Sequence, residues 1–99
     1  MTNVNTTLNS RQSTHGDFRD NGRIMQRLKF LMRTDGVNWQ AGKLEEFQQE
    51  ALDMIQHKIG RILSGNPSEP DHWLDICGYA QLVYNILTTG KSHTSQDPQ

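Results

Sequence analysis

Apolar side chains recur every three or four residues in three stretches of the chain, and this spacing is typical of amphipathic helices. In the first stretch a helix is predicted over residues 18–32, with one face formed by Ile24, Leu28 and Leu31. Asp17 stands where an N-cap side chain accepts a backbone hydrogen bond, so the helix is expected to begin directly after it. The valine and isoleucine residues follow the helical spacing and not the alternation of a strand, so no strand is predicted.

A second helix is predicted over residues 44–63, where successive residues step about 100° around the helix axis. Its broad apolar face carries Leu44, Phe47, Ala51, Ile55, Ile59 and Ile62. A narrow polar stripe on the other side carries Glu50, Asp53, His57 and Arg61. Gly65, followed by Asn66 and Pro67, is a typical helix end.

A third helix is predicted over residues 69–87, with Ser68 as its expected cap and Pro70 in its first turn. Its apolar arc is wide and carries Trp73, Ile76, Ala80, Val83, Tyr84 and Leu87. A helix that is apolar over half its circumference is usually covered on two sides. Gly78 in its interior indicates a close approach of another backbone or of a ligand. With three helices per chain, part of the cover is expected from another chain.

The two ends of the sequence contrast with these helices. Residues 1–13 contain only three large apolar residues, Met1, Val4 and Leu8, and residues 90–99 contain none. Such segments bury too little surface to offset the entropy lost on ordering, so both are predicted to be disordered tails. Residues 14–89 then form a single helical domain, which is marginal in size for a core of its own. The predicted fold is all-α: a small helical bundle of three main helices per chain, completed by oligomerisation.

Charge and cysteine content narrow the functional classes. Ten basic and eleven acidic residues give a net charge of −1, which argues against a general nucleic-acid binder. Cys77 is the single cysteine, so the chain has no intramolecular disulfide, and a reducing cytoplasm is expected. No apolar run approaches the ~20 residues needed to span a membrane. A cytoplasmic protein without a membrane partner is therefore expected.

Lys58 and Asp75 are the first candidate site residues, because both lie at the border of an apolar helix face. The short connection between the second and third helices favours an antiparallel arrangement that brings such residues together. One interpretation is a partly buried ion pair that fixes the helix register. The other is a ligand site in which Lys58 and Arg61 hold phosphates, while Asp75 holds a metal ion, a sugar or a base edge.

Two further groups have the residue types of a site. The stripe of Glu50, Asp53, His57 and Arg61 is either a solvated face with weak ion pairs or a magnesium site, although its two basic groups dilute the negative charge. Upstream, His15 and Asp17 flank a glycine at a helix start. Such a turn either presents backbone N–H groups to an anion or consists only of capping and turn residues.

Three segments of the chain, STHGDFRDN, ALDMIQHKIGRILSGNP and DHWLDICGYAQLV, together resemble a family of small proteins of tailed phages and prophages. The family pattern is H/Y-G-D, then A-L-x-M-x-x-x-K-x-x-R-I, then D-x-W-x-D-I-x-G-Y-A, and the match covers residues 13–84. The matching residues are His15, Gly16, Asp17, Lys58, Arg61, Asp71, Asp75, Gly78 and Tyr79. The resemblance implies no particular activity.

A more distant resemblance is to the MazG-like all-α nucleoside triphosphate pyrophosphohydrolases, which are oligomeric helical proteins that bind Mg²⁺. Their Glu-Glu-x-x-Glu helix is similar to Glu45, Glu46 and Glu50 here, with the last acid one residue late. Their second motif, Glu-x-x-Asp, reduces to Asp71 and Asp75. A magnesium site cannot lose ligands freely, so this resemblance supports an α-helical nucleotide-binding architecture more than catalysis.

Three functions follow as hypotheses. The favoured one is a phage-encoded, non-catalytic protein that needs no cofactor and sequesters a nucleotide-derived host immune signal. Its predicted ligand-binding residues are His15, Asp17, Lys58, Arg61, Trp73, Asp75 and Tyr79, with Trp39 as a further stacking candidate. The alternative is a MazG-like hydrolase that holds Mg²⁺ through Glu50, Asp53 and Asp75. The third is an adaptor that binds a host protein through its wide apolar arc. A homo-oligomer is expected, and nucleic acid is not an expected partner.

Overall fold

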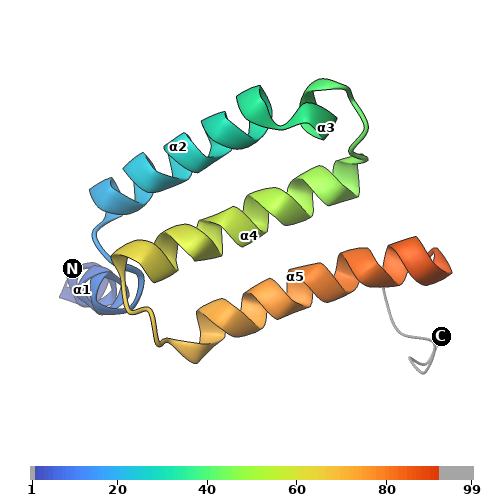
Figure 1. Cartoon of the computed structure of the whole chain (residues 1–99). Coiled ribbons are helices and arrows are strands. Elements are labelled where there is room, and N and C mark those ends of the chain that lie inside the picture. Colours follow the sequence, from blue (N-terminus) through green and yellow to red (C-terminus); the bar gives the residue numbers. More distant parts are fainter. Residues whose placement is uncertain (1, 92–99) are drawn as a thin grey trace.

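The structure, a computed structural model, describes residues 2–91, with side chains from residue 4 onward. This part of the chain is helical, with no strand (Figure 1). Its elements are α1 (Thr2–His15), α2 (Phe18–Asp35), α3 (Val37–Gln40), α4 (Glu46–Ser64) and α5 (Pro70–Thr89). The all-α class is confirmed. The three predicted helices correspond to α2, α4 and α5, and each predicted end lies within three residues of the observed one.

Helix α1 is the main difference from the sequence prediction, because it lies over most of the segment, residues 1–13, predicted as a disordered tail. Its composition is polar and it has no apolar face, so hydrophobic spacing contains no signal for it. The C-terminal end of α1 is held by the rest of the chain: the Asn66 backbone N–H donates to Thr14 O at 3.0 Å. At the other end of the chain, Gly90 caps α5 with a φ of 76°, and residues 92–99 of the predicted tail lie outside the described residues.

Capping explains where the main helices begin and end. Asp17 is the N-cap of α2, as predicted, and its Oδ1 accepts from the Arg19 N–H at 2.8 Å. Gly65 ends α4, and its N–H donates to Arg61 O at 2.8 Å. The predicted cap of α5 was wrong by one residue: Glu69 is the N-cap, and Pro70 then supplies the fixed φ of the first helical position.

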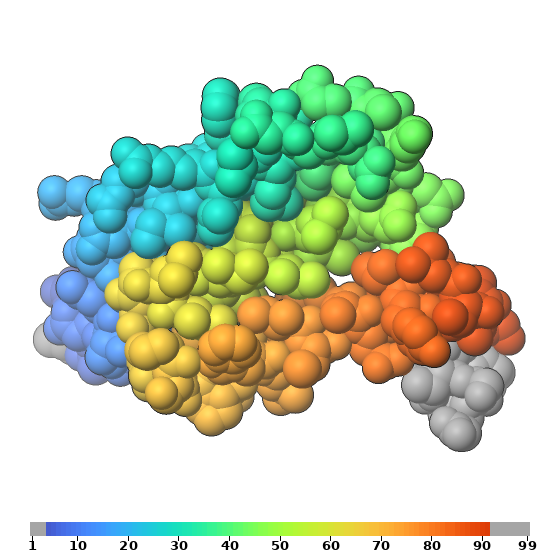
Figure 2. Space-filling view, viewed as in Figure 1, coloured from blue at the N-terminus to red at the C-terminus, as the bar shows by residue number. Residues whose placement is uncertain are grey.

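The three main helices lie side by side in one layer, with α4 between α2 and α5 (Figures 1 and 2). Helix α4 packs against both neighbours, whereas α2 and α5 do not contact each other. The radius of gyration is 16.2 Å, compared with about 13 Å for a compact chain of 100 residues. A single chain is therefore an open layer of helices and does not close into a bundle.

Few apolar side chains are enclosed within this layer. Over the residues with described side chains, only Met25 and Ala51 are buried apolar residues. Gly60 of α4 faces Met25 of α2, and a Cβ atom at Gly60 would lie 2.9 Å from Met25 Cγ. Glycine at this position therefore permits the close approach of α2 and α4. Apart from Gly60, the other buried residues are polar: Asn21, Gln56, His72 and Asn85.

Gln56 is expected to reduce the stability of the single chain. Its side chain is 2% exposed, and neither amide atom has a hydrogen-bond partner within the described residues. Burying an unpaired polar group costs about 1–3 kcal/mol, so Gln56→Met, which conserves volume, should raise the free energy of unfolding by about 1–2 kcal/mol in urea denaturation. The control is Gln49→Met on the same helix. Gln49 Nε2 donates to Leu44 O at 2.9 Å, so this variant should be destabilised. A loss of stability in Gln56→Met would contradict the prediction.

None of the helices in the described range, residues 2–91, combines the length and the apolar composition needed to cross a membrane.

Candidate functional site

Two turns cross at one end of the layer: the turn between α1 and α2, and the turn between α4 and α5. Gly16 has a φ of +87°, which favours glycine, and a Cβ atom there would collide with the Ser64 carbonyl group. A Cβ atom at Gly65 would lie 2.6 Å from Thr14 O and 2.7 Å from Gly16 N. The two backbones therefore touch, and this contact requires glycine on both sides.

Asn21 joins the crossing turns from the first two turns of α2. This buried side chain donates from Nδ2 to His15 O at 2.7 Å, and its Oδ1 contacts the Ser64 hydroxyl group. The Ser64 hydroxyl also lies 2.8 Å from Gly60 O. The His-Gly-Asp segment is thereby held against the end of α4, so two of the three sequence motifs meet in space.

His72 brings the third motif to the same place. This residue of α5 is 1% exposed, and its Nε2 lies 3.2 Å from Thr14 O and 3.4 Å from His15 Nδ1. A carbonyl oxygen can only accept, so the hydrogen of this bond must be on His72 Nε2. The two imidazole rings are 4.9 Å apart, centroid to centroid. The sequence reasoning missed His72, and the only available signal was its place within the third motif.

The surroundings of His15 favour its neutral form. Burial lowers the pKa of His15 from 6.5, and electrostatic interactions with Arg61, His72, Lys58 and Arg11 lower this pKa further. Fixed positive charge on α1 and α4 therefore acts on one imidazole. At neutral pH this imidazole can donate and accept hydrogen bonds without adding charge.

Stability is expected to fall as the pH drops below about 6.5. The pKa values of His15 and His57 are both lowered from 6.5, in each case chiefly by burial. Below this pH the unfolded chain takes up protons that the folded chain does not, so the contribution is complete above 6.5 and is lost as the pH falls toward the folded-state pKa values. Urea denaturation at pH 7.5 and 5.5 measures this change. In His15→Gln the free energy of unfolding should change less between these two pH values. An unchanged difference in that variant would show that His15 does not contribute to the pH dependence of stability.

A cavity of about 660 Å³ opens beside the crossing turns. It is lined by residues of α1, α2, α4 and the turn before α2: Leu8, Arg11, Gln12, His15, Gly16, Asp17, Phe18, Asn21 and Arg61. The lining residues include two arginines and one acid, and the carboxylate of that acid, Asp17, caps α2. The lining is therefore basic overall and attracts anions. Arg11 was not predicted, because it falls in the segment interpreted as a tail.

The predicted ligand-binding residues divide between this cavity and other places. His15, Asp17 and Arg61 line the cavity. Lys58 Nζ pairs with Asp75 Oδ2 at 2.9 Å, and the Lys58 side chain is only 13% exposed. The two residues thus form an ion pair in the free chain.

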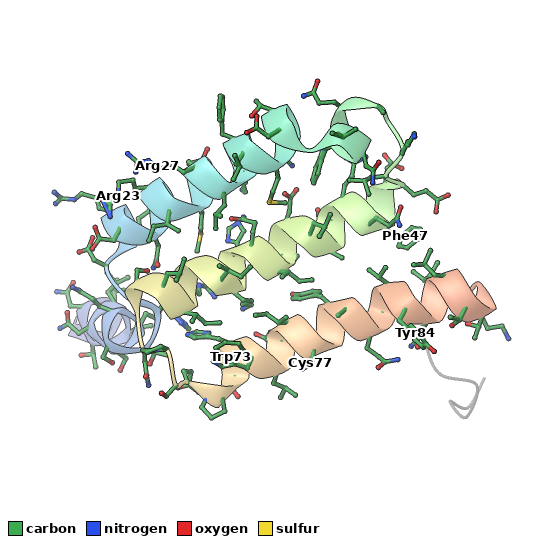
Figure 3. All side chains as sticks on the ribbon, viewed as in Figure 1. Arg23, Arg27, Phe47, Trp73, Cys77 and Tyr84 are labelled. Atoms are coloured by element: carbon green, nitrogen blue, oxygen red, sulfur yellow. The ribbon has the colours of Figure 1, made fainter. Side chains whose placement is uncertain are left out.

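Aromatic candidates lie elsewhere. Tyr79 lies with Asp75 in a shallow hollow on α5, separate from the cavity. The Trp73 indole Nε1 donates to Pro67 O at 2.8 Å, and the ring is half exposed near the start of α5 (Figure 3). Neither ring lines the cavity, so the structure does not bring these two stacking candidates to the arginines of the cavity.

The predicted magnesium ligands are not brought together. Asp53 Oδ2 pairs with Arg33 Nη2 at 2.7 Å, and the Arg33 guanidinium lies over the Trp39 ring at 4.4 Å. Asp75 is engaged by Lys58, while Glu50 borders an apolar groove between α4 and α5. Within residues 2–91, no group of three or more His, Cys, Asp or Glu side chains is arranged to hold a metal ion. This arrangement of acids does not fit the predicted Mg²⁺ site.

The fold and the cavity define a small all-α protein with an anion-attracting site at one end of a helical layer. The chain belongs to the family described as Domain of unknown function (DUF6378), whose model matches residues 1–87. The match includes α1 and extends into α5, so it contains both crossing turns and the cavity. No curated protein and no solved structure matches the chain.

Proposed function

We propose that this chain is a non-catalytic nucleotide-binding protein, and that its cavity holds the phosphate groups. The observation that carries the proposal is the pair of guanidinium groups, Arg11 and Arg61, in one cavity with the neutral imidazole of His15. Guanidinium groups bind phosphate oxygens in a bidentate manner, and the imidazole can bond to a ribose or base. A volume of about 660 Å³ is within the usual range for small-molecule sites.

Binding without turnover is favoured over hydrolysis by the ion pairs of the acidic residues. Asp53 and Asp75 would have to leave Arg33 and Lys58 in order to hold Mg²⁺. Such a change leaves partly buried cations without a partner, which is costly. Lys58 contributes in a different way in this proposal: together with Arg61 it keeps the region around His15 positive. The alternative is a MazG-like hydrolase, and the experiment below distinguishes hydrolysis from binding without turnover.

In the cell, the protein would act by sequestration. The resemblance of its three motifs to small phage and prophage proteins supports a phage origin, and a role against host defence is part of the proposal. A protein that binds a nucleotide-derived immune signal without changing it lowers the free concentration of that signal in proportion to its own concentration. We propose that this takes place in the bacterial cytoplasm. We also propose that the protein acts as a homo-oligomer, because a single open layer buries few apolar side chains.

The test is a thermal-shift screen of the purified full chain. The panel contains nucleoside triphosphates, cyclic dinucleotides and cyclic ADP-ribose isomers, each with and without Mg²⁺, followed by chromatography of the ligand. A ligand present at about 100 times its Kd should add about 2.7 kcal/mol of stability, and it should be recovered unchanged.

Two outcomes would overturn the proposal. Stabilisation that requires Mg²⁺ and yields a product would establish the hydrolase. Absence of a shift with every nucleotide would favour the adaptor that binds a host protein.

A further inference from the structure

The two broad sides of the layer differ in character. On α4, Asp53 faces α2 through Arg33, and Lys58 faces α5 through Asp75. These contacts fix which sides of α4 face α2 and α5. With a step of about 100° per residue, the residues of α4 on one broad side of the layer are all uncharged, and those on the opposite broad side include the charged residues. The uncharged side contains Leu52, Ile55, Ile59 and Leu63, and the charged side contains Glu50, His57 and Arg61.

The uncharged side is open to solvent. Leu52 is 39% exposed, Ile59 37% and Leu63 65%. Beside them is a groove of about 440 Å³, whose apolar lining comes from α2, α3, α4 and the residues between α3 and α4: Met32, Trp39, Leu44, Leu52, Ile55 and Ile59. On a chain of this size, so much contiguous apolar surface indicates an interaction site.

Helix α5 extends this surface. Leu82 borders the groove that also contains Glu50, so it lies on the charged side of the layer. Leu87 is about 140° further around the axis of α5 and is therefore on the uncharged side, where it is 61% exposed. The apolar face, defined by Leu52, Ile59, Leu63 and Leu87, thus runs across α4 and α5 and reaches α2 at Met32.

A second copy of the chain fits this face better than another occupant. Met25 and Ala51 are the only buried apolar residues from residue 4 to 91, so a single chain has little core of its own, and oligomerisation is the usual way for a small chain to complete one. In a two-fold dimer the same surface of each copy is buried, so the side that carries Glu50 and Arg61 would have to desolvate these charges, whereas the uncharged side would not. The layer measures 46 by 39 Å across, which is ample for the about 800 Å² that each partner buries in a standard interface.

We propose that a second copy of this chain packs on the apolar face, with α4 against α4 across a two-fold axis. The dimer is then two helical layers around one core, and the charged sides with the two cavities remain on the outside. The inference identifies the surface for the self-association proposed above. It does not depend on a nucleotide, because the dimer forms without ligand.

The test is the mass of the full chain in solution by light scattering, without ligand. The wild type should have twice the chain mass of 11.3 kDa. Leu52→Lys should shift the mass to that of one chain. The matched control is Leu82→Lys, at a leucine of similar exposure, 45%, on the charged side, and it should keep the dimer mass. A nucleotide that fails to bind would leave these masses unchanged, so the two proposals fail independently.

Three results would overturn this inference. A folded wild type with a mass of 11.3 kDa would leave the face open for a different protein. Dissociation by Leu82→Lys and not by Leu52→Lys would place the interface on the other side. If Leu52→Lys does not fold, Leu63→Lys takes its place in the mass measurement. The Tm of a dimeric wild type should rise with protein concentration. A wild-type Tm that does not depend on protein concentration is the third result that would overturn the dimer.

Discussion

Gly65→Ala is expected to destabilise the fold by about 3 kcal/mol and to abolish ligand binding in the cavity. The added Cβ atom would lie within 2.7 Å of backbone atoms of Thr14 and Gly16, and it would also meet the carbonyl carbon of His15. Backbone atoms cannot rotate away as a flexible side chain can. The crossing turns must therefore separate and lose the bond from the Asn66 N–H to Thr14 O. Urea denaturation followed by circular dichroism measures the loss.

Gly78→Ala is the matched control for this variant. The sequence indicated a close approach at Gly78, but nothing else in the described chain lies within 4 Å of a Cβ atom placed there. Alanine is the better helix former, so this variant should gain up to about 1 kcal/mol. Replacing glycine with alanine should therefore lower the free energy of unfolding at Gly65 and raise it at Gly78. Equal stability of Gly65→Ala and the wild type would show that the crossing of the turns is not part of the fold.

The three main helices could be predicted because local sequence determines them. The apolar spacing places α2, α4 and α5 within a few residues of their observed bounds, and Asp17 and Gly65 act as the predicted caps. The Lys58–Asp75 pair was also predictable. Both residues border an apolar face, and the short connection leaves the two helices little choice but to run antiparallel.

The arrangement of the helices was not predictable in the same way. Hydrophobic spacing identifies the residues that share one face of one helix, but it does not say which helix covers that face. The sequence therefore predicted a helical bundle and not an open layer, and only the wide apolar arc of α5 indicated that one chain leaves apolar surface uncovered. The cavity was missed for a related reason: Arg11 lies on α1, which is polar all round, and His72 is a buried polar residue that no periodicity identifies.

Arg61→Gln is expected to weaken the binding of nucleoside triphosphates about 10- to 100-fold, measured by titration calorimetry. A hydrogen bond to a charged group contributes about 1.5–3 kcal/mol, and Arg61 is one of only two guanidinium groups in the cavity lining. The control is Arg23→Gln on α2. Arg23 points away from α4 (Figure 3) and pairs with Asp20 on the surface at 3.4 Å, so its loss should leave the affinity nearly unchanged.

The pKa of His15 provides an independent readout for this variant. Arg61 is the strongest of the charges that lower it, so Arg61→Gln should raise the pKa of His15 toward 6.5 in an NMR titration of the free protein. A raised pKa with weakened binding means that the substituted charge is in the cavity and that the cavity holds the phosphates. A raised pKa with unchanged affinity means that the charge was removed from the cavity without effect, and the phosphates must then bind elsewhere on the chain.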